Sequence, residues 1–500
     1  MKPRAALLLA ACAALPAQQP GAWTWFLTND SLYQKNDLAK REVPAGEIPP
    51  LAGEKKPDQF QESLAFFGTY RFEAGGDLAL GATLRGVNFY KQDPNATLRS
   101  PETSLYRWSA KYRREGWSVQ AGDFHALLGQ GFVLSVLQND TLLRERTIRG
   151  AEARWQGSWL DLRALGGSVS TEVRSEGKMQ KWDVTAAEAV VEVLRGHRLG
   201  VRASQVKDAE APLFVPLVGR RLTDSFSLSG AEVLPGLSYY GEYGRLLYRD
   251  ERDRQLRRPA GNAAYGNLTY RSQGLLLLAE HKKYENFDNG MNNLPLADRE
   301  EEVNDLLHSE GTRLFAQYHV ARPDLTFFGS AGRYVEGPYI PGRGRRAGTS
   351  VYGGFSAEDL WDAVSASYSY GLRFVGYAVK KSMANLTTRF QQDWSLELSF
   401  RDKRSSQFGT SFHEQDLNTQ LAKASWGALW VLRQHSRDPI ELLGGGRNFY
   451  SAGVRANLRN GAYVELSGGR LRGGEVCSGG QCVTLPPFKG FKVAAHFQLR

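Results

Sequence analysis

Arginine side chains recur at alternate positions of strand-like segments, and they are the clearest candidates for chemistry in this sequence. The set assigned from the strongest alternation is Arg71, Arg85, Arg107, Arg113, Arg163, Arg373, Arg401 and Arg455. A guanidinium group stays charged at neutral pH and holds carboxylate or phosphate through paired hydrogen bonds. On the same faces, Asp161 and Glu397 are the acidic counterparts. An excess of arginine favours anions in a wet lumen, whereas full pairing with carboxylates would fill that lumen instead.

A compact basic segment is a second candidate binding site. It contains Arg343, Arg345 and Arg346, spaced by glycine in Gly342-Arg343-Gly344-Arg345-Arg346. Guanidinium groups this close together suit a polyanion such as lipid phosphate. The alternative is a solvated loop with no ligand.

Two cysteines near the C-terminal end form the third pattern. Cys477 and Cys482 are separated by four residues that include two glycines, a spacing that lets a short hairpin close through a disulfide in an oxidising compartment. A metal site is the competing interpretation, but two thiols without a nearby histidine are a poor ligand set. None of the histidines lies in a nucleophile motif, and no Cys-x-x-Cys-His haem motif occurs. The sequence therefore predicts no catalytic residue, no metal and no cofactor.

The segments that carry these residues alternate with a period of two. Trp394, Leu396, Leu398 and Phe400 alternate with Ser395, Glu397, Ser399 and Arg401, and the same pattern runs from Val364 to Phe374. This period places successive side chains on opposite faces of a sheet. In a soluble sandwich the apolar face would point into a core, and in a membrane barrel it would meet lipid.

Tight turns recur about every 38 residues, and each interval holds two strand-like runs around a longer polar loop. The eleven turn signals are centred on residues 75, 115, 157, 196, 235, 273, 323, 358, 392, 427 and 460. Twelve strand-loop-strand units predict about 24 strands, within a range of 20 to 26. A β-propeller is the structural alternative, but runs of about ten residues suit tilted membrane strands better.

Composition excludes the helical membrane class and favours the barrel. The mean hydropathy is −0.42, and beyond the first positions no apolar run reaches the length of a spanning helix. Short turns that alternate with long loops are typical of transmembrane antiparallel up-and-down β-barrels. The terminal segment 488–500 has a barrel-like last strand that the barrel-assembly machinery would recognise, although Arg500 stands where many such strands end in an aromatic residue.

The N-terminal residues predict export. Lys2 and Arg4 precede an Ala/Leu run that is too short to span a membrane, so residues 1–17 are assigned to a cleaved signal peptide and 18–500 to the barrel. The alternative is a lipoprotein in which Cys12 is lipidated. Residues 34–60 form a polar segment expected to be an extracellular loop. The net charge of +10 is modest for 500 residues and is no nucleic-acid signature.

Two glycine motifs interrupt the strand pattern between residues 122 and 131. Gly122-Asp123-Phe124 is followed by Gly129-Gln130-Gly131. Glycines in a barrel strand permit a kink or a close backbone approach. The segment is therefore either a corner of the wall or an inward fold that narrows the pore, and without a βαβ context it is no nucleotide-binding loop.

These motifs also carry a resemblance to a known family. Together with Pro57-Asp58-Gln59-Phe60, Arg149-Gly150-Ala151-Glu152 and the stretch from Tyr284 to Pro295, they resemble an uncharacterised outer-membrane β-barrel family of Bacteroidetes-type bacteria. The resemblance covers about residues 57–175 and extends more weakly to about 320. Its members have no assigned activity, so it implies a porin-like fold and an outer-membrane location rather than a mechanism.

The function expected from all of this is passive passage of small polar or anionic solutes across a bacterial outer membrane. Outer-membrane lipid and lipopolysaccharide are the expected surroundings, and no nucleic acid is expected to bind. The alternative is a closed scaffold barrel that anchors a surface or periplasmic partner, including a sheath for a separate electron-transfer protein. A membrane-embedded enzyme is a third class, for which no motif was found.

Overall fold

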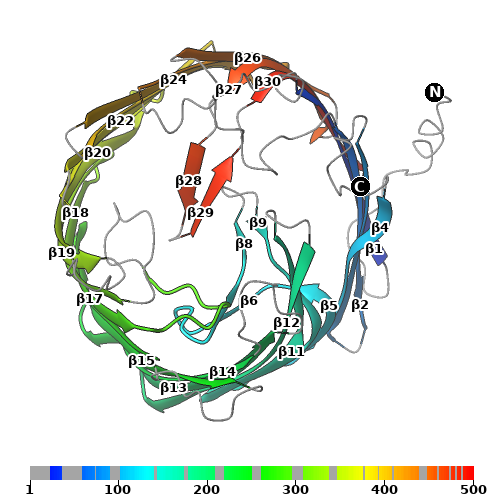
Figure 1. Ribbon diagram of the computed structural model, residues 1–500, viewed down its shortest axis with the longest axis vertical. Coiled ribbons are helices and arrows are strands. Elements are labelled where there is room, and N and C mark those ends of the chain that lie inside the picture. Colours follow the sequence, from blue (N-terminus) through cyan, green and yellow to red (C-terminus); the bar gives the residue numbers. More distant parts are fainter. Residues whose placement is uncertain are drawn as a thin grey trace.

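The chain folds into a closed antiparallel barrel (Figure 1). The computed structural model describes residues 23–36, 59–73, 75–89, 102–139, 144–173, 178–208, 219–250, 261–295, 308–336, 346–374, 378–391, 393–407, 410–437, 448–458, 461–471, 474–478, 481–485 and 488–499. The first strand, β1 (Trp23–Asn36), pairs with both β2 (Gln59–Arg71) and the last strand, β30 (Phe488–Leu499). Closure satisfies the backbone groups that an open edge would leave unpaired.

The wall contains 24 strands, as the turn spacing predicted. The strands between β2 and β30 are β3 (Asp77–Phe89), β4 (Glu102–Arg114), β5 (Trp117–Phe124), β10 (Ile148–Gln156), β11 (Leu160–Val173), β12 (Lys178–Leu194), β13 (His197–Asp208), β14 (Gly219–Leu234), β15 (Leu237–Asp250), β16 (Gly261–Ser272), β17 (Leu275–Glu285), β18 (His308–Val320), β19 (Leu325–Glu336), β20 (Arg346–Leu360), β21 (Val364–Phe374), β22 (Ala378–Phe390), β23 (Trp394–Gln407), β24 (Thr410–Lys423), β25 (Gly427–Ser436), β26 (Asn448–Asn457) and β27 (Tyr463–Leu471). Among the described residues, no helix is long and apolar enough to cross a bilayer.

Three short hairpins lie outside the wall sheet. They are β6 (Ala126–Leu128) with β7 (Leu134–Val136), β8 (Gln138–Asn139) with β9 (Arg144–Glu145), and β28 (Gly474–Ser478) with β29 (Gln481–Leu485). In Figure 1 all three are drawn within the ring of wall strands. The backbone register of the last hairpin sets Cys477 opposite Cys482, and the disulfide between them stays a prediction.

Two boundaries expected from the sequence are wrong. The turn assigned to residues 357–359 lies farther along, because β20 continues through a bulge between Ala357 and Leu360 and the chain reverses at residues 361–363. The segment 34–60 was assigned to a polar loop, but its two ends are strand, since β1 extends to Asn36 and β2 begins at Gln59; residues 37–58 lie outside the described residues. Polar residues at strand ends pair in the ladder as readily as apolar ones, so the polar composition hid these ends. The assigned signal peptide and Cys12 lie outside the described residues.

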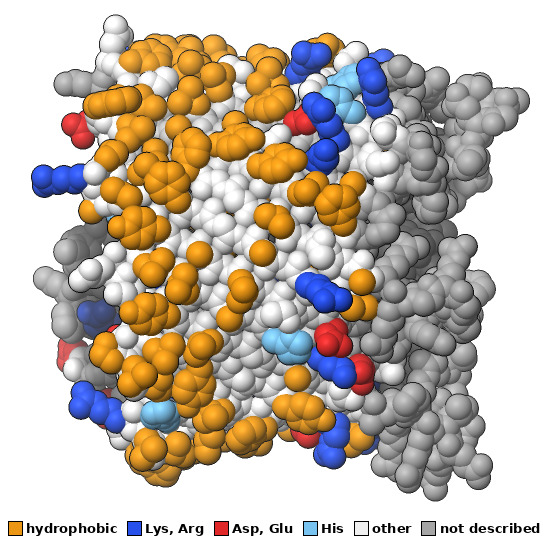
Figure 2. Space-filling model, turned by 90° about the vertical axis from the view of Figure 1, so that its left-hand side faces the viewer, with side chains coloured by type: hydrophobic (Ala, Val, Ile, Leu, Met, Phe, Trp, Pro, Cys, Tyr) orange, Lys and Arg blue, Asp and Glu red, His pale blue; other side chains and the backbone are white. Residues whose placement is uncertain are grey.

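The face of the barrel seen in Figure 2 carries a broad surface of hydrophobic side chains. Exposed large hydrophobic side chains occur on wall strands all around the sheet, among them Val119, Leu162, Val201, Phe226, Tyr243, Leu268, Leu277, Leu314, Phe327, Val351, Tyr368, Phe400, Leu417, Val431 and Val454. A soluble protein does not leave such a large apolar surface uncovered. A closed barrel with an apolar exterior is the β-architecture that spans a membrane, because lipid requires every backbone polar group to be paired within the wall.

The strand β5 loses one of its two neighbours at Gly122. It pairs with β4 only as far as Ser109 opposite Gly122, stays paired with β10 through Phe124, and then enters the barrel. Gly122 has φ of +101°, and a Cβ there would lie 2.2 Å from the Trp108 carbonyl oxygen. Only glycine combines this conformation with such a close backbone approach.

Side chains replace the backbone ladder where β5 leaves β4. The Asp123 carboxylate accepts a hydrogen bond from the Trp108 backbone N–H at 3.0 Å. Arg149 on β10 donates to Asp123 at 3.0 Å and to the Tyr106 carbonyl oxygen at 2.9 Å. The side chain of Asp123 is only 4% exposed. This pair satisfies backbone groups that would otherwise lose their partners.

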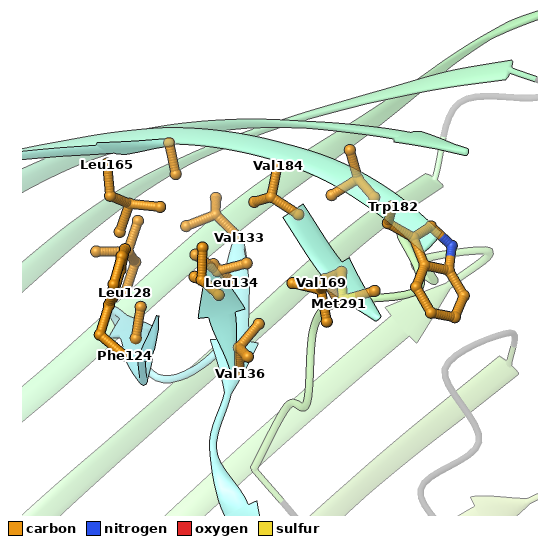
Figure 3. Packing of buried hydrophobic residues seen from close by; sticks show 14 residues of the cluster. Phe124, Leu128, Val133, Leu134, Val136, Leu165, Val169, Trp182, Val184 and Met291 are labelled. Carbon is orange, nitrogen blue, oxygen red and sulfur yellow. The ribbon is translucent and has the colours of Figure 1, made fainter. Parts of the chain in front are cut away.

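Two segments fill part of the barrel interior. The first inner segment comprises residues 125–136 and the second comprises residues 286–295. Leu128, Val133 and Leu134 of the first segment and Met291 of the second are fully buried against β11–β13 (Figure 3). The Ser135 N–H donates to the Met291 carbonyl at 2.6 Å, and Asn293 N–H donates to the Gly131 carbonyl at 3.2 Å. The two segments therefore form one packed unit inside the wall.

A substitution at Gly122 tests the point at which the chain leaves the wall. We expect Gly122→Ala to destabilise the barrel by about 1–3 kcal/mol, because the added Cβ meets the Trp108 carbonyl and the φ is unfavourable for alanine. The matched control is Gly241→Ala, where a Cβ meets nothing within 4 Å. Urea unfolding of the detergent-solubilised protein measures both, and equal midpoints for the two variants would contradict this account.

Candidate functional site

The register places all eight arginines assigned from the alternation on the inner face of the wall. Each of them has at least one neighbour in sequence that is an outward-facing apolar residue, as with Arg163 beside Leu162 and Arg401 beside Phe400. Opposite residues in an antiparallel pair share a face, and Arg107 lies opposite Thr83 while Trp108 lies opposite the outward-facing Ala82.

Most of these arginines have a partner on the inner face. Arg113 pairs with Asp77 at 2.9 Å, Arg163 with Glu152 at 3.1 Å and Arg401 with Asp416 at 2.5 Å. The others whose contacts are resolved lie over aromatic rings: Arg373 over Tyr334, Arg455 over Tyr463, and both Arg85 and Arg107 over Tyr106. Arg71 lies opposite Asp77 in the register. Carboxylates thus neutralise part of the positive charge, and aromatic rings contact other guanidinium groups without neutralising them.

A buried carboxylate joins the first inner segment to the wall. Glu242 on β15 has a side chain that is 0% exposed. One of its oxygens accepts the backbone N–H of Gln130 at 3.1 Å and the Tyr240 hydroxyl at 2.5 Å. The other accepts the Ser225 hydroxyl at 2.6 Å and lies 3.4 Å from the Arg202 guanidinium. Four donors on one carboxylate offset its desolvation.

The Gly-Gln-Gly motif has the shape that this contact requires. Gly129 has φ of +59°, and a Cβ there would lie 2.6 Å from a Glu242 oxygen. Gly131 has φ of +84°, and its Cβ would lie 2.2 Å from the Asn293 carbonyl oxygen. The two glycines let a tight turn fit between the wall carboxylate and the second inner segment.

Further hydrogen bonds fix the unit at both ends. The Arg163 guanidinium donates to the Leu127 carbonyl at 2.9 Å. The Val133 carbonyl accepts from the Ser204 hydroxyl at 2.8 Å and from the Asn289 side-chain amide at 2.9 Å. Asn289 is itself fully buried and also donates to Thr223 of β14 at 3.0 Å. Each inner segment is therefore bound both to the wall and to the other segment.

The contact between the Glu242 carboxylate and the Gln130 turn is called the latch below. A polar chamber lies beside it. It has a volume of about 360 Å³ and is lined by Leu127, Gly129, Gln130, Arg154, Arg163, Glu188, Arg202 and Tyr240. A neighbouring hollow of about 270 Å³ shares Arg154, Arg163, Glu188 and Arg202 and adds Arg198. A chamber of this size has room for a small organic molecule.

The charge balance of the chamber depends on Arg154. Arg163 is compensated by Glu152, and Arg202 by Glu188 at 2.5 Å and by Glu242. Arg154 is exposed, and among the described residues no carboxylate pairs with it. It is therefore the guanidinium in this chamber that a solute can reach without displacing an ion pair.

Other residues singled out in the sequence lie apart from the chamber. Asp123 and Phe124 are at the point where the chain leaves the wall, with Phe124 in the apolar core and Asp123 bonded to Arg149. Arg343 and Arg345 lie outside the described residues, and Arg346 is the first residue of β20. Within the described part of the chain, no group of His, Cys, Asp and Glu is arranged to hold a metal ion.

Sequence reasoning missed the residues that build the chamber. Glu242, Tyr240 and Arg202 lie on different wall strands, and Gln130 is 112 positions from Glu242. The available signal was the alternation itself, because Glu242 and Arg202 occupy inner-face positions of β15 and β13. Arg154 could have been found in the same way, as it lies opposite Arg163.

A family of unknown function, DUF6029, matches residues 81–308. This range contains both glycine motifs, Glu242 and both inner segments. The family has no assigned activity, in agreement with what the resemblance implied. No curated protein sequence matches the chain.

Solved structures show a weak likeness to outer-membrane barrels. The outer membrane protein opdK from Pseudomonas aeruginosa is 13% identical, with a TM-score of 0.42 over 81% of this chain and 98% of that chain. A BenF-like porin from Pseudomonas fluorescens Pf-5 is 12% identical, with a TM-score of 0.43 over 80% and 97%. The structure of Pseudomonas aeruginosa OpdK with vanillate is 12% identical, with a TM-score of 0.44 over 80% and 97%. At these TM-scores the likeness does not bear on substrate or mechanism.

Replacing the buried carboxylate tests the latch. We expect Glu242→Gln to destabilise the packed inner unit by about 3–5 kcal/mol, because an amide cannot compensate Arg202 and presents one acceptor instead of two. Hydrogen exchange of amides in residues 125–136 should become faster, while the wall strands keep their protection. The control is Asp224→Asn, whose exposed pair with Arg245 at 3.3 Å should contribute no more than about 1 kcal/mol. Unchanged exchange in Glu242→Gln would rule out the latch.

Proposed function

We propose that this protein is an outer-membrane channel that lets small polar solutes pass, with a preference for small anions. The observation that carries the proposal is the polar chamber beside the first inner segment, with the guanidinium of Arg154, which has no carboxylate partner among the described residues, in its lining. An open polar chamber inside a membrane barrel is a place through which a hydrated solute can move. A positive group there raises the local concentration of anions.

The inner segments support a narrowed rather than a wide passage. They pack on β11–β17 and leave the chamber between Gln130 and the wall arginines. A solute that passes close to Arg154, Arg163 and Arg202 experiences their charge at short range, where water screens it least. The acidic solutes that suit this lining are small carboxylates and inorganic anions.

A closed scaffold barrel is the second candidate. The observation in its favour is the extent of pairing on the inner face, where Arg113, Arg163 and Arg401 each have a carboxylate partner. In such a barrel the inner unit would be a plug, and the function would lie in a surface or periplasmic partner. The two candidates differ in one property, which is ion conduction.

Export and membrane assembly complete the proposal. The N-terminal residues 1–17 would be removed on export, and β30 would direct insertion by the barrel-assembly machinery. The long loops would face outward and the tight turns the periplasm, which is the usual asymmetry of such barrels. Outer-membrane lipid and lipopolysaccharide would surround the apolar wall.

Reversal of the charge at Arg154 tests the proposed selectivity. In a planar bilayer under a salt gradient, we expect steady, anion-selective conductance from the unmodified protein. Arg154→Glu should lower the anion-to-cation permeability ratio several-fold, because a unit charge at about 4 Å in water contributes about 1 kcal/mol and its sign is inverted.

Lys423→Gln is the control for that experiment. Lys423 lies on the outer face of β24, over the Trp394 ring at 5.5 Å, so its loss should leave the reversal potential unchanged. A reversal potential that does not move in Arg154→Glu would contradict the assignment of this residue. Silence from a folded, heat-modifiable barrel would favour the scaffold.

A further inference from the structure

A row of basic side chains crosses four wall strands on the outer face of the barrel. Lys380 of β22 lies opposite Arg404 of β23, which lies opposite His413 of β24. The backbone N–H of Arg437, directly after β25, donates to the His413 carbonyl at 2.9 Å and continues the row. With strands about 4.8 Å apart, the row is about 14 Å long.

Two more nitrogen-bearing side chains lie one and two same-face positions below this row, toward the tight turns. Arg433 and His435 are outward-facing positions of β25, and the His435 ring lies 6.3 Å from the His413 ring. Among the described outward-facing positions of β22–β25 at this end, Asp402 is the carboxylate. This part of the outer face therefore has four permanent positive charges, on Lys380, Arg404, Arg433 and Arg437, and one negative charge, on Asp402.

Asp402 organises the centre of the row rather than cancelling it. It accepts from His413 Nε2 at 2.6 Å, from Arg404 at 3.1 Å and from Gln415 at 3.0 Å. Arg404 nevertheless remains 65% exposed. Lys380, Arg433 and Arg437 are exposed as well, and none of them has an ion-pair partner among the described residues.

The row lies where the apolar exterior ends. On the same strands, Phe400, Leu417 and Val431 are outward-facing and exposed, on the side nearer the tight turns. Figure 2 shows blue and pale-blue side chains gathered between the hydrophobic surface and the loop end of the barrel. In a membrane this is the level of the lipid headgroups, and on the loop side it is the outer leaflet.

We propose that this row, comprising Lys380, Arg404, His413 and Arg437, binds the phosphate of a lipid headgroup in the outer leaflet. Guanidinium and ammonium groups on adjacent strands contact several oxygens of one phosphate. The acyl chains of the same lipid lie on Phe400, Leu417 and Val431 below. The site is outside the barrel and is independent of whether the lumen conducts.

The surroundings favour a lipid over a protein partner. A protein interface is surrounded by a polar, solvent-accessible rim. On the side nearer the tight turns, the row instead borders the apolar exterior of the barrel. A lipid with a phosphorylated headgroup has its charged part and its apolar part in the same order along the membrane normal as the basic row and the apolar side chains of the wall. The charged row and the apolar strands beneath it therefore match one molecule rather than two.

Native mass spectrometry of the full chain in detergent tests the site. The probes are phosphatidic acid, which carries a phosphomonoester, and phosphatidylcholine with the same acyl chains. We expect selective retention of phosphatidic acid by the unmodified protein. The double variant Lys380→Gln/Arg437→Gln should bind it about twentyfold more weakly, since each basic residue near a membrane surface contributes about fivefold. Both residues lack ion-pair partners, so the barrel itself should stay intact.

The matched control removes two cations from the opposite end of the outer face. Arg114 of β4 and Lys423 of β24 are outward-facing residues next to the tight turns, and Arg114→Gln/Lys423→Gln should bind phosphatidic acid like the unmodified protein. Equal binding by both double variants would overturn the proposal, and so would an equal loss in both. Displacement of the lipid by millimolar inorganic phosphate would overturn the lipid assignment, because it would show that free phosphate suffices.

Discussion

The buried carboxylate of Glu242 is the group on which the interior of this barrel depends. A charge without solvent contact is costly unless it is fully hydrogen-bonded, and Glu242 reaches four donors only when the Gly-Gln-Gly turn brings the Gln130 amide to it. The wall supplies Arg202, Ser225 and Tyr240, and the first inner segment supplies the remaining donor. The position of that segment and the electrostatics of the wall are thus coupled.

The wall must keep its backbone groups hydrogen-bonded at the point where β5 separates from β4 and the chain enters the barrel. A membrane barrel cannot leave backbone N–H and C=O groups unpaired toward lipid. At Gly122 the strand leaves its neighbour, and Asp123 with Arg149 bonds the Trp108 and Tyr106 backbone groups that β5 no longer reaches. The glycine motifs have different functions in the fold: the first permits the exit from the wall, and the second permits the turn at the latch.

Local pattern was enough to predict the wall but not its contents. A period of two needs only neighbours in sequence, so the 24 strands and the inner faces of residues such as Arg163 and Arg401 could be predicted. The turn near residue 358 was misplaced because a bulge in β20 shifts the register, and alternation alone does not reveal a bulge. The choice between a wall corner and an inward fold at residues 122–131 depends on Glu242, more than a hundred residues away, which a local pattern cannot predict. A local pattern also could not predict that Arg163 pairs with Glu152 on the neighbouring strand, because the register between the two strands determines which side chains meet.

Together these features describe a barrel whose passage is shaped by a packed unit latched to the wall. The chamber with Arg154 lies between the wall arginines and the Gln130 turn, whose backbone N–H donates to Glu242. The measurement that tests this account most directly is the single-channel conductance of Glu242→Gln against the unmodified protein in the same bilayer. Release of the latch should give a larger and noisier conductance, because the first inner segment would no longer occupy a fixed place in the lumen. Identical conductance, with identical noise, would contradict the account.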